Sequence, residues 1–418
     1  MHVVVIGGGV MGVTTAWYLR EAGFEVTLLD AAPEPAAGAS HANGGMLHAS
    51  HAEPWNTPGV GLDLLRYLGR EDSPLLIRPR ALPGLAGWGL RFLWHSRHSA
   101  FERHALVNAR LAAFSLRETR RLSRELADEG LAFDFRESGI LKIFRDRDSL
   151  ARNRRAAEAM QAEGVRFEAW ATEQVIDREP ALAGVRDELC GGLYFPDDAV
   201  GDARRFTAGL LEIARRHGLR YRPATRVRRL RTFQGRIDAI ETDEGPIAAD
   251  ACVVASGYEA PALLRPLGLH LPVAPVKGYS LTLPMDAELR LDLPLIDDAS
   301  KVVMTPLGDR LRLAGTAEFA GHDARMEDRR AANVLAQCRR TLPGLPAQFD
   351  HETMAPWAGL RPMSDRGTPI LGPTAVPGLH LNTGAGHLGW TFACGAAAQV
   401  RDGLAGMAPE DSLAAFRL

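Results

Sequence analysis

Residues 3–12 read VVVIGGGVMG, and this stretch decides the fold. Its β-branched half predicts a buried strand, its glycines predict a tight turn, and the apolar spacing over residues 13–19 predicts a helix. Residues 25–30 form a second β-rich run that ends on Asp30. This order of strand, turn, helix and strand predicts a dinucleotide-binding unit of an α/β protein.

Gly7, Gly9 and Gly12 have the GxGxxG spacing. The first glycine permits the turn, the second lets the backbone approach a pyrophosphate, and the third lets the helix pack closely. Asp30 stands where a carboxylate binds a ribose diol. The neighbouring positions that complete this part of the predicted cofactor site are Val10, Met11 and Ala31. The motif does not separate FAD from NAD, and a glycine-rich turn in another kind of βαβ unit is the alternative interpretation.

Later segments favour a flavin. Residues 38–46 (GASHANGGM) offer small side chains that let the backbone approach an extended cofactor, although an ordinary loop has the same composition. Residues 250–257 predict a buried returning strand, preceded by a hairpin over 235–245. Residues 378–391 predict a strand and a glycine loop before an alanine-rich helix at 392–403, whose dipole would stabilise an anionic reduced ring. The predicted cofactor contacts in and beside these segments are Ser40, Asn43, Gly44, Gly45, Met46, Val227, Ala255, Ser256, Gly257, Gly384, Gly386, His387, Leu388, Gly389, Trp390 and Thr391.

Composition limits the class of protein. The 418 residues are 46% hydrophobic and 24% charged with a formal net charge of −2, which argues against a nucleic-acid partner and predicts two interleaved domains. The four cysteines are far apart and lack zinc-site spacing, so we expect no metal site and reduced thiols in a cytoplasmic protein. No run of about 18 apolar residues predicts a membrane-spanning helix.

Residues 85–98 are apolar with a basic edge. They favour a core helix, and the alternative is a peripheral contact with the inner face of the cell membrane, beside a quinone pool.

The tracts GGGVMG (7–12), ASHANGG (39–45), VVASG (253–257), GLRPMSDRGTPILG (359–372) and NTGAGHLGWT (382–391) together resemble the D-amino acid oxidase/glycine oxidase superfamily. Within it the chain is similar to bacterial D-amino acid dehydrogenases of the DadA type, including D-hydroxyproline dehydrogenase-like members, from Met1 to about Gly406. The resemblance implies an α/β fold: a Rossmann-like (GR2-type) FAD-binding domain with an inserted mixed, antiparallel-rich substrate domain. We expect the FAD domain to comprise residues 1–53, 201–270 and 357–418, and the substrate domain 54–200 and 271–356.

Non-covalent FAD is expected, because Asn43 stands where some relatives attach flavin through a histidine, although His41 is close by. A substrate carboxylate is best bound by the planar, permanently charged guanidinium of an arginine, and Arg361 is the candidate. Tyr279 is a candidate second contact, through its hydroxyl or its ring, but an alternating strand would equally bury it. The remaining candidates are His387 as a catalytic residue and Met46, His48 and His51 as substrate contacts.

The resemblance implies oxidation of a D-amino acid, or of a cyclic imino acid such as D-proline or cis-4-hydroxy-D-proline, to the imine. Hydride passes from Cα to flavin N5, and the electrons go on to a non-oxygen acceptor such as a quinone. The alternatives are a glycine- or sarcosine-type oxidase that releases hydrogen peroxide, and a flavin domain acting in tRNA modification. The sequence makes no prediction of the oligomeric state.

Overall fold

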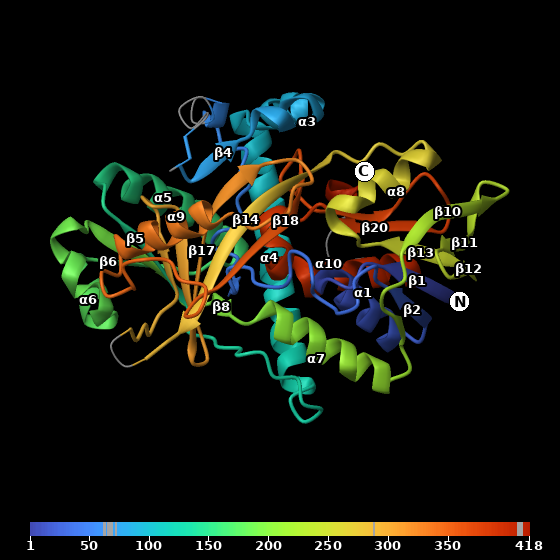
Figure 1. Cartoon of the computed structure of the whole chain (residues 1–418), viewed down its shortest axis with the longest axis horizontal. Coiled ribbons are helices and arrows are strands. Elements are labelled where there is room, and N and C mark those ends of the chain that lie inside the picture. The colour runs from blue at the N-terminus through green and yellow to red at the C-terminus, as the bar shows by residue number, and fades with distance from the viewer. Residues whose placement is uncertain (62–63, 65–69, 72, 287–288, 408–412) are drawn as a thin grey trace.

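The computed structural model describes residues 1–418 except 62–63, 65–69, 72, 287–288 and 408–412. Within the described residues two large sheets stand side by side, each with helices against it (Figure 1). The mixed α/β class predicted from the sequence is confirmed.

The first sheet is the dinucleotide-binding sheet. In spatial order its strands are β19 (Ile370–Pro373), β20 (Leu379–Thr383), β13 (Ala251–Val254), β1 (His2–Ile6), β2 (Glu25–Leu29) and β9 (Arg220–Arg222). All neighbours pair in parallel except β19 and β20. Strand β1 is central because its four apolar residues are buried on both faces, as expected for a parallel sheet covered by helices.

Helices close this sheet into a core. They are α1 (Val10–Glu21), α7 (Ala203–Arg216) and α10 (Gly389–Ala405), with the long α4 (His98–Glu125) packed against α10. Residues 390–400 of α10 are all buried, so this alanine-rich helix is surrounded by protein on every side. Small side chains let α1 and α4 approach it closely: a Cβ on Gly395 would lie 2.8 Å from the Cβ of Ser115.

The second sheet is predominantly antiparallel. In spatial order its strands are β18 (Ala355–Ser364), β14 (Val273–Pro284), β17 (Arg310–Phe319), β16 (Val302–Leu307), β15 (Leu295–Asp297), β5 (Ile140–Phe144), β7 (Gly191–Phe195) and β6 (Glu168–Trp170), with β4 (Leu75–Ile77) beside β17. The parallel pairs are β15 with β5 and β17 with β4. Helix α9 (Asp328–Arg339) packs on one face of β14 and β17, and α5 (Arg147–Met160) and α6 (Thr172–Arg178) flank the far end.

Smaller elements complete the fold. They are the ribbon β3 (Met46–Leu47) with β8 (Ala199–Val200), the meander β10 (Val227–Phe233), β11 (Arg236–Thr242) and β12 (Gly245–Ala248), and the helices α3 (Leu82–His95) and α8 (Ala260–Leu264). Residues 235–245, expected as a hairpin, are instead the middle strand of the meander and its two turns. Helix α3 buries only Trp88 and Phe92, so the core-helix interpretation of residues 85–98 holds for one face alone. Among the described residues, no helix is long and apolar enough to cross a membrane.

One segment expected with the dinucleotide-binding sheet belongs to the second sheet. Residues 357–364 were expected in the FAD domain, but β18 pairs with β14 along ten residues and is the edge of the second sheet. The sequence did not indicate this pairing, because β18 is followed directly by β19, which belongs to the first sheet. Arg361 is therefore carried by the sheet that faces the cofactor-binding sheet.

Candidate active site

A cavity of about 720 Å³ lies between the two sheets. One end is formed by Gly7, Gly8 and Gly9 together with Asp30, where β1 and β2 end. The other end reaches Arg361 on β18 and His387 in the loop before α10. Ligands of open α/β sheets bind beyond the carboxyl ends of the strands, and this cavity occupies that place.

The glycine turn is shaped as the motif predicts. Gly7 has φ +115°, and a Cβ there would lie 2.6 Å from the carbonyl oxygen of Ala255 on the neighbouring segment. A Cβ on Gly12 would collide with the carbonyl oxygen of Gly7, so the third glycine lets α1 approach the strand rather than bordering the cavity. Asp30 accepts hydrogen bonds from Gly8 N at 2.7 Å and Ala32 N at 3.0 Å, while burial raises its pKa.

Two helices begin at the cavity. Helix α1 starts after Gly9, which has no side chain to cap it, and α10 starts at Gly389 after a loop with Gly384 and Gly386 at positive φ. Neither helix has an acidic residue in its first turn. Val10 N at the start of α1 donates to Ser40 Oγ at 3.0 Å. The helix dipole and the other amides of the first turns make both ends favourable to negative charge, as expected for the pyrophosphate and for an anionic reduced ring.

Arg361 is a partly buried cation with no anion beside it among the described residues. It borders the cavity, its guanidinium lies over Gly278 of β14, and a Cβ at that glycine would collide with it. No described carboxylate pairs with it, and its Cζ lies 5.5 Å from the ring centre of Trp55. Enclosure lowers the pKa of Arg361 to about 10, so the side chain remains charged at neutral pH. A charge that is partly removed from water and has no partner is costly, which points to an anionic ligand.

Three histidines gather beside Arg361. His387 stacks on Trp55 with ring centres 5.0 Å apart, and the rings of His48 and His51 meet edge to face at 5.8 Å. Burial lowers the pKa of His48 to about 4 and holds the pKa values of His51 and His387 well below the ordinary value. Buried nitrogens, His48 Nδ1 and His51 Nε2, have no hydrogen-bond partner among the described residues. The histidines are therefore neutral, and Arg361 is the fixed positive charge at this end.

Asp198 holds the segment that carries His48 and His51. Its carboxylate accepts hydrogen bonds from Ala49 N at 3.0 Å and from the hydroxyl of Ser50. The side chain is 2% exposed, and burial raises its pKa to about 7 despite these bonds. The sequence analysis did not select Asp198, because an aspartate in a loop has no distinguishing pattern.

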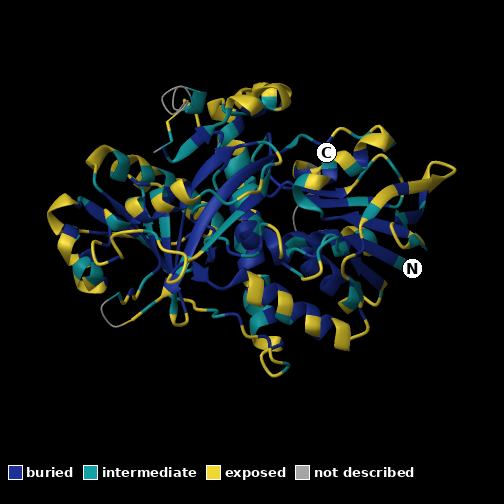
Figure 2. Ribbon diagram, viewed as in Figure 1, coloured by how far each residue is buried: buried dark blue, intermediate teal, exposed yellow. Residues whose placement is uncertain are grey.

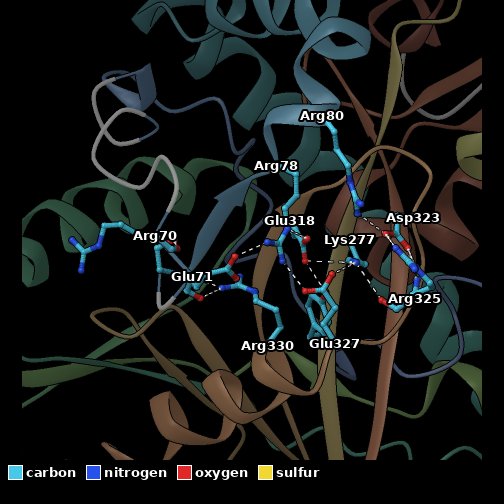
Figure 3. Close-up of polar contacts among 12 residues, drawn as sticks. Arg70, Glu71, Arg78, Arg80, Lys277, Glu318, Asp323, Arg325, Glu327 and Arg330 are labelled. Atoms are coloured by element: carbon cyan, nitrogen blue, oxygen red, sulfur yellow. Dashed lines mark hydrogen bonds and ion pairs between the residues drawn. The ribbon is translucent and has the colours of Figure 1, made fainter.

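Tyr279 borders the cavity, but its hydroxyl is bonded to a residue of the protein. Its hydroxyl donates to Glu318 Oε2 at 2.6 Å, and its ring packs in the core beneath α9, on the face of β14 opposite Arg361 (Figure 3 shows the charged groups around Glu318). Neighbouring residues of a strand point to opposite faces of the sheet. Gly278 lies under the guanidinium of Arg361, so the side chain of the next residue, Tyr279, points to the other face. The buried-strand alternative is the one the structure shows, and burial raises the pKa of this phenol.

Most predicted cofactor residues border the cavity. Those that do are Gly7, Gly9, Val10, Met11, Asp30, Ala31, Ser40, Asn43, Gly44, Val227, Ala255, Ser256, Gly257, Gly384, Gly386, His387, Gly389 and Trp390. Those set behind its wall are Gly12, Gly45, Met46, Leu388, Thr391, His48 and His51. His41, the neighbour considered for covalent attachment, stacks on Trp357 at 6.3 Å.

The sequence analysis missed several aromatic and polar residues of the site. The residues that border the cavity are Trp357, Tyr258, His322 and Asn382. The ring of Trp55 stacks on His387 and lies 5.5 Å from Cζ of Arg361. Nothing in the sequence around Trp55 indicated contact with residues more than 300 positions away.

Residues 2–402 match the DAO family, described as FAD dependent oxidoreductase. The chain belongs to this family. It is 43% identical over 412 residues to a D-amino acid dehydrogenase of Methylobacterium nodulans, covering 98% of this chain and 96% of that protein. It is 41% identical to the D-amino acid dehydrogenase of Dechloromonas aromatica, covering 98% of each chain.

Solved structures share the fold of the family. Glycine oxidase from Geobacillus kaustophilus aligns with a TM-score of 0.79 at 23% identity, covering 100% of this chain and 97% of that one. L-proline dehydrogenase from P. horikoshii aligns with a TM-score of 0.78 at 17% identity, covering 100% and 96%.

The enzyme is thus an FAD-dependent oxidoreductase, and the cavity fits FAD. The close approach at Gly7 and the open start of α1 suit a pyrophosphate. Two buried polar atoms on the cavity wall, Ser256 Oγ and Asn382 Oδ1, have no hydrogen-bond partner among the described residues and are free to bind the cofactor.

Proposed function

We propose that this enzyme is a D-amino acid dehydrogenase that also accepts cyclic imino acids such as D-proline and cis-4-hydroxy-D-proline. One observation carries the proposal: the guanidinium of Arg361, without a described carboxylate partner, borders the same cavity as the glycine turn. The names of the relatives that are 41–43% identical support the choice of substrate class.

Arg361 binds the substrate carboxylate through two parallel hydrogen bonds and so fixes the position of Cα. Bound FAD supplies the acceptor for the hydride that leaves Cα. The acidic residues on the described cavity wall are Asp30 and Glu259, and neither is an ion-pair partner of Arg361. With Arg361 near and no described carboxylate beside it, the site disfavours the ammonium form and favours the neutral amine from which hydride can leave.

The electrons pass to a quinone dissolved in a membrane. Overall, the amino acid zwitterion and the quinone yield the iminium carboxylate and the quinol, so two hydrogens leave the substrate, one from Cα and one from nitrogen. A primary iminium then reacts with water to give the 2-oxo acid and ammonium. We propose that FAD is bound without a covalent link, because residue 43, where some relatives attach flavin through a histidine, is an asparagine.

Anaerobic reduction of the bound flavin, followed by its absorbance across a panel of D- and L-amino acids, tests the proposal. We expect bleaching by D-amino acids and by cyclic D-imino acids, and none by their L-enantiomers. Bleaching by L-amino acids alone would overturn it. The same substrates under air, with a peroxide assay, separate the dehydrogenase from a glycine-type oxidase, which releases hydrogen peroxide at the rate of substrate oxidation.

A further inference from the structure

Three side chains of the second sheet hold three consecutive carbonyl groups of a loop on the cavity wall, residues 42–44. Each bond joins one side chain to one carbonyl oxygen: Ser280 Oγ on β14 to Ala42 O at 2.6 Å, Arg312 Nη1 on β17 to Asn43 O at 2.8 Å, and Thr305 Oγ1 on β16 to Gly44 O at 2.6 Å. Strands β14, β17 and β16 are neighbours in that order. The loop therefore crosses three strands and is bound once by each.

The side chains that hold the loop are buried and lie behind it, not on the cavity wall. Ser280 is 1% exposed, Thr305 0% and Arg312 4%, and Figure 2 shows the strands that carry them buried along most of their length. Arg312 is itself held by Thr282 Oγ1, which accepts from its Nε at 2.6 Å, and by Asp202 at 3.7 Å. Buried polar side chains that are bonded to the backbone fix that backbone in one position.

Two glycines let the loop lie close against the sheet. A Cβ on Gly44 would lie 3.2 Å from Cγ2 of Val303. A Cβ on Gly45, which has φ +72°, would lie 3.1 Å from Cδ1 of Leu307. The small residues of this segment were expected to let the backbone approach the cofactor, and at these two positions they also let it approach the second sheet. The position of the loop is therefore set by that sheet.

The same bonds decide where the amides of the loop point. The C=O and N–H groups of a trans peptide unit point in opposite directions, and the described residues contain no cis peptide bond. Because the carbonyls of Ala42 and Asn43 face the sheet, the amides of Asn43 and Gly44 face the cavity. Neither amide has an acceptor among the described residues, whereas the amide of Gly45 donates to Asn43 Oδ1 at 2.9 Å. Two hydrogen-bond donors are thus left for a ligand.

The loop lies beside the place proposed for the substrate. Ser280 is two residues from Gly278 on β14, about 7 Å along the strand, and the guanidinium of Arg361 lies over Gly278. The hydride acceptor has to lie next to the Cα whose carboxylate Arg361 binds. This step rests on the proposed function, and it favours the flavin ring over the pyrophosphate as the partner of the two amides.

We infer that Ser280, Thr305 and Arg312 are positioning residues that hold the amides of Asn43 and Gly44 toward the flavin ring and so raise its reduction potential. Hydrogen bonds to the ring tune the electronic properties of a flavin. Donors that are fixed in advance favour the form of a ligand that carries more negative charge, which is the reduced ring. The sheet that binds the substrate thereby also sets how readily the flavin accepts its electrons.

Thr305→Val tests the inference, because valine has nearly the shape of threonine but lacks the hydroxyl that holds Gly44 O. The reduction potential of the FAD-loaded enzyme is measured by stepwise anaerobic reduction with dithionite beside a reference dye. Thr305→Ser, which keeps the hydroxyl, is the rescue variant, and Ser280→Ala is a second and smaller change to the same support. The matched control is Thr207→Val, since the buried hydroxyl of Thr207 also donates to a carbonyl, Ala203 O at 2.6 Å, but within α7 and off the cavity wall.

We expect Thr305→Val and Ser280→Ala each to shift the equilibrium between oxidised and reduced flavin about tenfold toward the oxidised form, which corresponds to ~30 mV. Thr305→Ser and Thr207→Val should keep the wild-type potential. An unchanged potential in both Thr305→Val and Ser280→Ala overturns the inference, as does an equal fall in Thr305→Ser or Thr207→Val. Weaker FAD binding with an unchanged potential also overturns it and assigns the two amides to the pyrophosphate. Failure of D-amino acids to bleach the wild-type flavin refutes the proposed function alone, because dithionite needs no substrate site.

Discussion

The two faces of strand β14 carry buried charge in opposite ways. Beneath α9, Lys277 and Glu318 are both fully buried with 3.6 Å between Nζ and Oε2, and Arg78 adds a bond to Glu318 at 2.6 Å (Figure 3). On the face toward the first sheet, Arg361 is enclosed by Gly278 and Trp55 and has no described carboxylate partner. Charges that are paired within the protein hold the structure together, and a buried charge left unpaired is available to a ligand.

The largest effect is expected on the paired face, from Glu318→Gln. The substitution keeps the shape but removes the fully buried carboxylate and leaves Lys277 with the more distant Glu327, at 3.8 Å, so the free energy of unfolding should fall by about 3–5 kcal/mol. Urea unfolding with saturating FAD measures it. Glu173→Gln is the control, because Glu173 and Arg186 form an exposed pair at 3.4 Å worth about 0–1 kcal/mol. Equal losses in both variants would show that the buried pair contributes no more than a surface one.

On the unpaired face, Arg361→Lys should raise the substrate concentration for half-maximal anaerobic bleaching by about 100-fold, because lysine cannot form two parallel bonds to a carboxylate. FAD content and stability should be unchanged. Arg312→Lys is the matched control: this buried arginine donates to Asn43 O at 2.8 Å and Thr282 Oγ1 at 2.6 Å, so its loss should lower FAD content and raise the substrate concentration by no more than about tenfold, through the flavin potential. Unaltered bleaching in Arg361→Lys would remove this residue from the site.

A smaller effect is expected from Gly278→Ala, which tests the same face through its neighbour. The new methyl group would collide with the guanidinium of Arg361 and displace it, which we expect to raise the half-saturating substrate concentration by about tenfold. Steady-state kinetics with a soluble dye measure the change. Gly344→Ala, where a Cβ would meet open space, should behave as wild type. A normal half-saturating concentration for Gly278→Ala would mean that the guanidinium is placed by other contacts.

Short-range patterns explain which parts were predicted. The strand, glycine turn and helix of residues 3–21 follow from local spacing, and so does the second helix start at Gly389. The membership of β18 in the second sheet depends on pairing with β14, about 80 positions earlier, which no local pattern records. The same limit hid Trp55, whose partners Arg361 and His387 come from distant segments.

Strand alternation explains why the sequence left the role of Tyr279 open. Period-two spacing shows that neighbouring residues point to opposite faces, but it does not say which face is the active site. Gly278 decides this, because only a residue without a side chain leaves room for Arg361, and that contact joins two strands. The sequence could predict the arginine from its motif but could not place the tyrosine.

Tyr279→Phe is the smallest expected change and the sharpest test of the two faces. Glu318 would lose one hydrogen bond but keep Arg78 and Lys277, so the free energy of unfolding should fall by about 1 kcal/mol. The half-saturating D-amino acid concentration should not change, because the hydroxyl lies on the face away from Arg361. If this concentration instead rose about tenfold with stability intact, the hydroxyl would have to reach the substrate, and the division of β14 into a structural face and a ligand face would be wrong.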